Sequence, residues 1–156
     1  MGSLYLFKFL HYLGIILLAG NITVTAIWKV FADRNGDWRL VAFGQRMVTG
    51  TDFGLTIPGI VLTMVGGYGS IWVMGYSLFE PPWLLWSQIM FVVAGAIWLF
   101  ILVPIQIKQA RIANGFTEQN GVTNEYKRLS RLWIMWGLVS TIPLVIVLWL
   151  MIAKPL

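Results

Sequence analysis

Hydrophobic and polar positions alternate along this chain on the scale of whole helices rather than of single turns. Four long apolar stretches, at about 4–31, 51–78, 83–107 and 132–153, are separated by shorter polar segments. Each stretch exceeds the roughly 20 residues that a helix needs to cross about 30 Å of hydrocarbon. The pattern predicts an all-α fold, a four-helix transmembrane bundle whose first partner is the lipid bilayer.

Composition agrees with this pattern. Hydrophobic residues make up 58% of the 156 residues, charged residues only 11%, and the mean hydropathy is +0.78. A soluble domain of this size could not bury so much apolar surface. We expect a single transmembrane domain over 1–156, because no segment is left over for a second domain. The first stretch lacks a basic start and a small-residue cleavage site, so we expect it to be a span rather than a signal peptide.

The distribution of charge predicts the orientation. Of the 11 Lys and Arg residues, all but Lys8 and Lys154 lie in the segments 29–46 and 108–131. Basic loops stay on the cytoplasmic side of a membrane. The rule places both termini on the outer, periplasmic side of a bacterial inner membrane, in a multi-pass protein. The net charge of +5 does not indicate nucleic-acid binding, because these residues form no continuous basic face.

Turn residues and prolines divide the chain further. Asp33–Asp37 contains Asn-Gly and predicts a sharp turn, and 39–48 could form a short helix at the membrane surface. Pro58, Pro104 and Pro143 lie inside the apolar stretches. Each lacks a backbone N–H, so we expect each to kink or interrupt its helix.

Small residues indicate where helices approach one another in lipid. They are Gly14, Ala19 and Gly20 in the first stretch, Gly59, Gly66, Gly67 and Gly69 in the second, and Ala94, Gly95 and Ala96 in the third. Plain helix packing explains them. The glycines around Tyr68 would also leave room for a bulky planar ligand.

Polar residues within the stretches form two layers. The outer layer is Lys8, His11, Gln88 and Glu80, and the inner layer is Asn21, Thr23, Thr25, Asp52, Thr56 and Gln106, flanked by Arg46 and Arg131. Such groups are costly in lipid and usually face the protein interior.

Asp52 has a structural and a functional interpretation. With Thr51 beside it, it could cap the start of the second helix or pair with Arg46. The functional alternative is an ion or proton path through Asn21, Asp52 and Gln106.

His11 is the one histidine of the chain, and three interpretations of it stay open. It could be a buried neutral histidine, a ligand of haem iron or another metal, or a proton relay. Zinc usually takes three or four protein ligands, and without cysteine there is no disulfide, iron–sulfur cluster or c-type haem. Haem needs only one strong axial ligand. Met74, Met90, Met151 or the His11 of a second copy could supply another.

The haem hypothesis assigns further residues. Lys8 lies one turn from His11 and could bind a porphyrin propionate as a charge-assisted contact. Tyr12 and Gln88 could hydrogen-bond a propionate or orient the imidazole. The predicted cofactor site is therefore His11, as metal ligand, with Lys8, Tyr12 and Gln88 around a haem b.

The segment Lys8–Gly14, leading to Gly20-Asn21, resembles the start of a bacterial membrane family known as domain of unknown function 2269. Asp52 through Pro58-Gly59, followed by Gly66, looks like the second block of that family. The same Lys-x-x-His opening is similar to that of HemJ, the four-helix protoporphyrinogen oxidase, and more distantly to the CopD membrane domain. The HemJ resemblance implies haem binding at His11 with Lys8 beside it.

Three functions follow as hypotheses. The first is a membrane protein that binds a b-type haem or porphyrin through His11 for a redox role, as in an oxidoreductase of the protoporphyrinogen oxidase type. The second is a non-catalytic subunit or scaffold, either a homodimer or part of a larger membrane complex. The third is a small transporter or channel that uses the inner polar layer.

Overall fold

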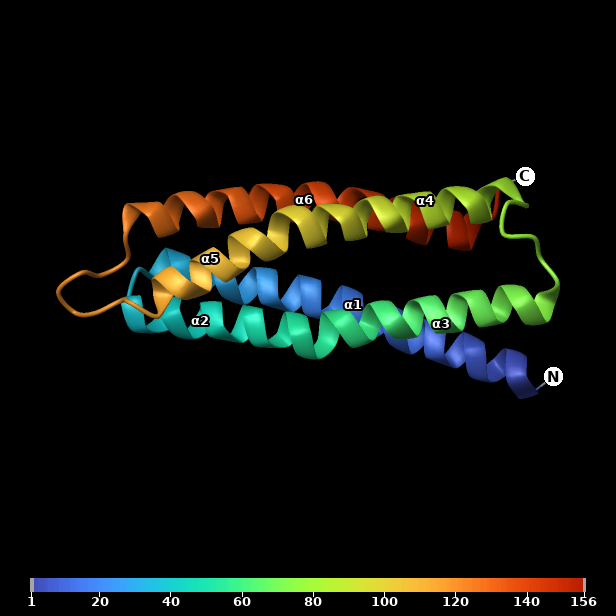
Figure 1. Ribbon diagram of the computed structural model, residues 1–156, viewed down its shortest axis with the longest axis horizontal. Helices are drawn as coiled ribbons and strands as arrows, with labels where there is room; N and C mark the ends of the chain where they lie inside the picture. Colours follow the sequence, from blue (N-terminus) through green and yellow to red (C-terminus); the bar gives the residue numbers. More distant parts are fainter. Residues whose placement is uncertain (1, 156) are drawn as a thin grey trace. The chain divides into compact units, whose positions relative to one another are not determined.

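The computed structural model describes residues 2–155, and this part of the chain is all-α, without a strand. Its elements, in order, are α1 (Gly2–Asn35), α2 (Trp38–Thr51), η1 (Asp52–Thr56), α3 (Ile57–Met74), α4 (Pro82–Ile97), η2 (Trp98–Leu102), α5 (Val103–Ala113) and α6 (Asn124–Ala153). The η segments are single π-helical turns that join their neighbours (Figure 1). The result is 4 continuous helices long and apolar enough to cross a membrane, which confirms the predicted spans.

The second span begins earlier than the hydrophobic pattern predicts. It starts at Trp38 rather than near Thr51, and its cap is Asp37, whose side chain accepts a hydrogen bond from the Arg39 amide at 2.8 Å. The expected surface helix over 39–48 is therefore the first part of the span. The first turn is also shorter than predicted, because α1 continues to Asn35 and only Gly36, at φ 78°, and Asp37 separate the helices.

Two of the three prolines coincide with a change of helix type. Pro58 follows η1 and Pro104 follows η2, and in both cases the amide just before the proline bonds to the carbonyl five residues back, Ile57 to Asp52 and Val103 to Trp98. A proline ring crowds the preceding turn, and a wider π turn relieves that crowding. The predicted interruptions are confirmed there, whereas α6 continues as one helix through Pro143.

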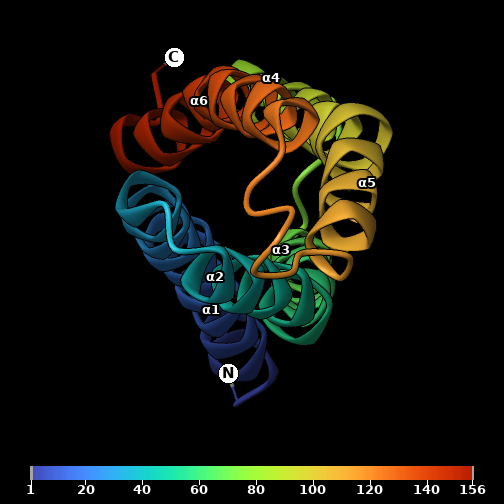
Figure 2. The same cartoon turned by 90° about the vertical axis from the view of Figure 1, so that its left-hand side faces the viewer.

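The chain folds as two compact units. Unit 1 comprises residues 1–75 and 113–122, and unit 2 comprises residues 76–112 and 123–156. In unit 1, α1 packs against α3 and, towards its C-terminal end, against α2 (Figure 2). In unit 2, α4 and η2 pack against α6. The single domain over 1–156 stays a prediction, as does the outer location of the termini.

The core of unit 1 is a seam between antiparallel helices. Its buried positions on α1 are Gly14, Leu18, Asn21, Thr25 and Lys29, and on η1 and α3 they are Asp52, Thr56, Gly59, Thr63 and Gly66. Successive positions are three or four residues apart, which keeps one face of each helix towards the other. The seam is unusually polar for a membrane segment, and that composition positions the candidate site.

Candidate functional site

The backbones of α1 and α3 approach each other at three glycines. A Cβ built on Gly14 would lie 2.7 Å from the Gly59 carbonyl oxygen, one on Gly59 would lie 2.9 Å from the Leu18 amide, and one on Gly66 would lie 2.7 Å from the His11 Cα. No larger residue fits at these distances. The predicted contacts through Gly14, Gly59 and Gly66 are confirmed, but Gly20 and Gly95 have nothing within 4 Å and are not contact residues.

His11 lies in this seam, half-buried, one turn before Gly14. Its Nδ1 is 2.8 Å from the backbone carbonyl oxygen of Thr63 on α3. A carbonyl oxygen only accepts, so Nδ1 is the donor, and in an uncharged imidazole with this tautomer the lone pair is on Nε2. The ring lies against Gly67, where a Cβ would be 3.2 Å from Nδ1. Two features of α3, a carbonyl and a glycine, therefore fix the orientation of the imidazole.

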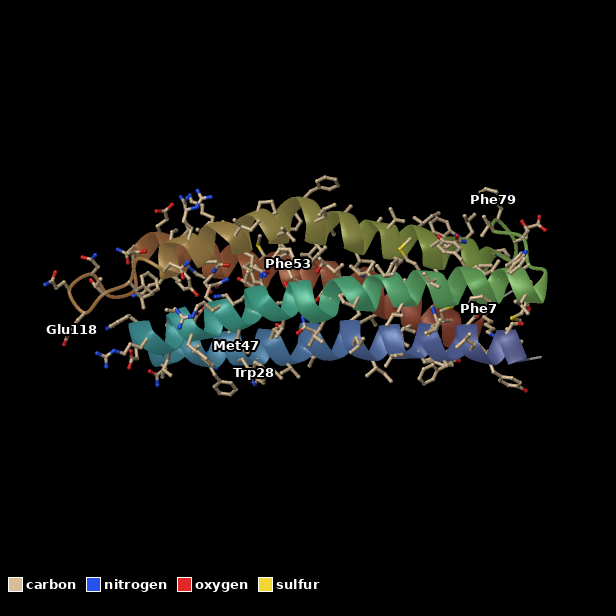
Figure 3. The ribbon with its side chains drawn as sticks, turned by 60° about the horizontal axis from the view of Figure 1, so that its bottom comes forward. Phe7, Trp28, Met47, Phe53, Phe79 and Glu118 are labelled. Atoms are coloured by element: carbon tan, nitrogen blue, oxygen red, sulfur yellow. The ribbon has the colours of Figure 1, made fainter. Side chains whose placement is uncertain are left out.

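Thr63 was not predicted as part of the site. Its position between Gly59 and Gly66 on one helix face was the available signal, but the group that contacts His11 is a backbone carbonyl, which every residue carries. One turn beyond, the Phe7 ring occupies the space that a side chain at Gly69 would fill (Figure 3). The part of the seam nearest the N-terminus thus packs the His11 ring against Gly67 and the Phe7 ring against Gly69.

Lys8 and Tyr12 are close to His11 in sequence but not in the seam. Lys8 is exposed, on the outward side of α1. The Tyr12 side chain is 61% exposed, and its ring centroid is 6.1 Å from that of His11 at a tilt of 57°. Both side chains are free of the α1–α3 contact, so a group bound at His11 from the outside of the pair could meet them.

Gln88, the fourth predicted site residue, belongs to unit 2. Its Nε2 donates to the Leu78 carbonyl at 2.8 Å and to the Leu84 carbonyl at 3.2 Å. These bonds attach the segment before α4 to the first turns of that helix. The structure therefore brings His11 and Tyr12 together, with Lys8 on the next turn, and gives Gln88 a local role at the start of α4.

The inner polar layer of unit 1 is centred on Asp52. Its Oδ1 accepts hydrogen bonds from Asn21 Nδ2 at 2.9 Å and from Thr56 Oγ1 at 3.0 Å, and Asn21 Nδ2 also donates to Thr56 Oγ1 at 2.9 Å. The predicted helix cap at Asp52 is wrong, because the helix passes through this residue and starts at Trp38. The predicted pairing with Arg46 is also wrong: Arg46 is exposed, and Asp52 is directed towards α1.

A buried ion pair in unit 1 was missed. Lys29 was expected in the first basic loop, but α1 continues past it, and its side chain is 1% exposed. Its Nζ lies 3.0 Å from Asp33 Oδ2, one turn later. The signal was the i, i+4 spacing of opposite charges within a helix, which the predicted turn at Asp33 concealed. By contrast, Trp28 next to it is half exposed (Figure 3).

Unit 2 also holds polar contacts, between α5 and the first half of α6. Trp133 Nε1 donates to Gln106 Oε1 at 3.3 Å, which joins α6 to α5. Lys108 and Glu125 form an ion pair at 2.6 Å with both side chains about half exposed. Gln109 is fully buried, and its amide has no hydrogen-bond partner among the residues described. Such a buried amide is uncommon and usually meets water.

These observations define the class of protein first: an all-α integral membrane protein with four apolar spans and polar layers inside one helix pair. The chain belongs to the family of predicted integral membrane proteins called DUF2269, whose model matches residues 5–155. The resemblance inferred from Lys8–Gly14 and from the Asp52 block is thereby confirmed. Neither the curated proteins nor the solved structures include a match to the chain.

Proposed function

We propose that the protein binds a b-type haem or a related porphyrin through His11, for a redox role in a bacterial inner membrane. The observation that carries the proposal is the hydrogen bond from His11 Nδ1 to the Thr63 carbonyl at 2.8 Å. Histidines that ligate metals commonly donate their other ring nitrogen to a carbonyl or carboxylate, which fixes the ring and raises its basicity. This bond leaves Nε2 with the lone pair that iron would take.

The donor set suits a porphyrin better than a bare metal ion. Within residues 2–155 no group of three or more His, Cys, Asp or Glu side chains could hold a metal together. A porphyrin brings four nitrogen ligands of its own and needs only an axial imidazole from the protein. One oriented histidine therefore fits this cofactor.

The residues around His11 would have distinct tasks. The Thr63 carbonyl holds the Nδ1 proton, and Gly67 lets the ring lie close to α3. Lys8, exposed one turn away, would bind a propionate, and the Tyr12 hydroxyl could donate to the same group. A bound haem would supply one-electron chemistry. Gln88 contributes nothing to this proposal, because its amide hydrogens already bond to Leu78 and Leu84.

The test is the absorption spectrum of protein purified in detergent from haem-supplied cells. We expect a Soret band in the wild type, its loss in His11→Ala, and its return when imidazole is added to His11→Gly. Gln88→Ala is the matched control and should keep the band. Colourless wild-type protein that takes up no added haemin, or full occupancy in His11→Ala, would reject haem binding and favour a non-catalytic membrane subunit.

A further inference from the structure

Asp52 is a carboxyl group inside a membrane-crossing helix, far from either of that helix's ends. Its side chain is 7% exposed, and it begins the π turn that joins α2 to α3. Ionisable side chains at such depth are costly and are usually retained for a function. The haem proposal does not use Asp52, so its presence needs a separate explanation.

The groups around Asp52 show which ligand it suits. Asn21 Nδ2 and Thr56 Oγ1 both direct hydrogens to the same oxygen, Oδ1. Hydrogen-bond donors stabilise a carboxylate, whereas sodium or another hard cation needs several oxygen lone pairs. The amide nitrogen of Asn21 offers none, and the Thr56 oxygen already accepts from Asn21. The arrangement suits a carboxylate that gains and loses a proton.

We propose that Asp52 is a proton-binding site of the α1–α3 helix pair, with Asn21 and Thr56 as positioning residues that stabilise its deprotonated form. The proton comes from the aqueous phase and returns to it, so no other reactant is needed. Binding it would neutralise the carboxylate and weaken the bonds from Asn21 and Thr56. Because Asn21 is on α1 and Asp52 is on η1, protonation would loosen one tie between the two helices.

The elements packed against η1 also carry charged side chains. On α1 the cation nearest to Asn21 in sequence is Lys29, which is buried and paired with Asp33, and on α2 the cation nearest to Asp52 is Arg46, which is exposed. Positive charges favour the carboxylate, and burial favours the protonated acid. α3 carries no acidic or basic side chain between Ile57 and Met74. At this site, therefore, burial favours the protonated acid, whereas the hydrogen bonds from Asn21 and Thr56 favour the carboxylate.

A hydrophobic carbodiimide tests the proposal, because it reacts with protonated carboxyl groups in apolar surroundings and leaves a stable acylurea. We would treat the purified protein between about pH 4 and pH 9, a range that brackets shifted carboxyl groups, and locate the adduct by mass spectrometry. We expect Asp52 to react increasingly as the pH falls, and no such adduct in Asp52→Asn. A water-soluble carbodiimide should instead modify the exposed Asp37.

Variants of the two donors separate a proton site from a merely buried carboxyl. Asn21→Ala and Thr56→Val each remove one hydrogen bond to the carboxylate, so each should raise the pH midpoint of labelling by about one unit. Thr56→Ser should restore the wild-type midpoint. Thr25→Val is the matched control, because the Thr25 hydroxyl is equally buried but donates to the Asn21 backbone carbonyl at 2.6 Å.

Infrared spectroscopy provides a readout that does not depend on access of the reagent. The difference spectrum between wild type and Asp52→Asn should show a protonated carboxyl absorption that disappears as the pH rises. Its absence throughout the range would overturn the proposal. A midpoint unchanged in both Asn21→Ala and Thr56→Val would also overturn it. Because labelling follows Asp52 rather than His11, these results are independent of haem binding.

Discussion

The two units hold their membrane helices together by different means. In unit 1, α1 and α3 meet backbone to backbone at Gly14, Gly59 and Gly66, and polar side chains bond across the seam. In unit 2, side chains fill the space between α4 and α6, with Leu84, Ser87 and Ala94 buried on α4. A Cβ added at Gly95 or Gly137 of unit 2 would have nothing within 4 Å.

The comparison shows that a small residue indicates a contact only when its helix face is occupied by a partner. Gly59, Thr63 and Gly66 recur at intervals of four and three, so they share one face and let a whole helix approach. Gly95 follows the buried Ala94 and points away from it. Periodicity, rather than glycine content, separates the two cases.

The largest expected difference between the two units is in how accessible their loops are to a reagent outside the cell. A cysteine placed at Asn120, in the part of unit 1 that follows α5, should be shielded from an impermeant thiol reagent in intact cells, since basic segments stay in the cytoplasm. A cysteine at Ser77, between α3 and α4, should be labelled. The chain has no other cysteine to interfere. The reverse result would invert the predicted topology. Glu118, close to Asn120 in this loop, is also exposed (Figure 3).

Adding a side chain to the seam should disrupt unit 1 strongly. In Gly66→Val the new Cβ would meet the backbone of His11 and Phe7, neither of which can rotate away. We expect a loss of about 3 kcal/mol in the free energy of unfolding, measured by tryptophan fluorescence in detergent. Gly137→Ala is the control in unit 2 and should be neutral or slightly stabilising. Equal losses would show that the two units do not differ.

The ion pairs of the two units should also differ in strength. Lys29 is 1% exposed and Asp33 18%, whereas Lys108 and Glu125 are 52% and 51% exposed. Lys29→Met leaves a partly buried carboxylate without this cation and should cost about 2 kcal/mol. Lys108→Met should change the same unfolding free energy by less than about 0.5 kcal/mol. A larger effect at Lys108 would contradict the burial argument.

Replacing a helix cap should give the smallest difference in stability between the two units. Asp37 caps α2 with a bond of 2.8 Å to the Arg39 amide, and Thr123 caps α6 with a bond of 3.3 Å to the Tyr126 amide. Replacing either residue by alanine should cost about 1 kcal/mol. The loss should be larger for Asp37, whose negative charge also favours the helix dipole. Circular dichroism during thermal unfolding would rank the two variants, and a greater loss at Thr123 would refute this order.

Sequence patterns predicted the spans better than their ends. Apolar length alone identified the four membrane helices, because the bilayer sets a minimum length. It missed the start of the second span, because residues 38–50 are more polar than the rest and still helical. Thr51-Asp52 has the composition of a helix cap, but the helix already begins at Trp38, and no residue between Trp38 and Thr51 interrupts it. Residues 38–56 are helical because they pack against α1, which their local composition does not reveal.

The candidate site could be predicted only in part. A single histidine at membrane depth was visible in the sequence, and so was the need for a partner. The partner itself, a carbonyl on Thr63, is 52 residues away and has no side-chain signature. The bond from Asn21 to Asp52 is different, because both residues belong to the polar layer that the sequence indicated. Side-chain partners leave a pattern in the sequence that backbone partners do not.

The π turns before Pro58 and Pro104 have a consequence for how chain length can vary. A π turn holds one residue more than the α-helix it replaces, and one residue turns everything beyond it by about 100°. The wider turn absorbs this residue, so deleting Leu55 would return η1 to an ordinary α turn and keep the buried faces of α2 and α3 in their present relation, whereas a deletion elsewhere in the span would rotate one face away from the other. The turn therefore acts as a register device, which lets one continuous span present two differently built halves to α1.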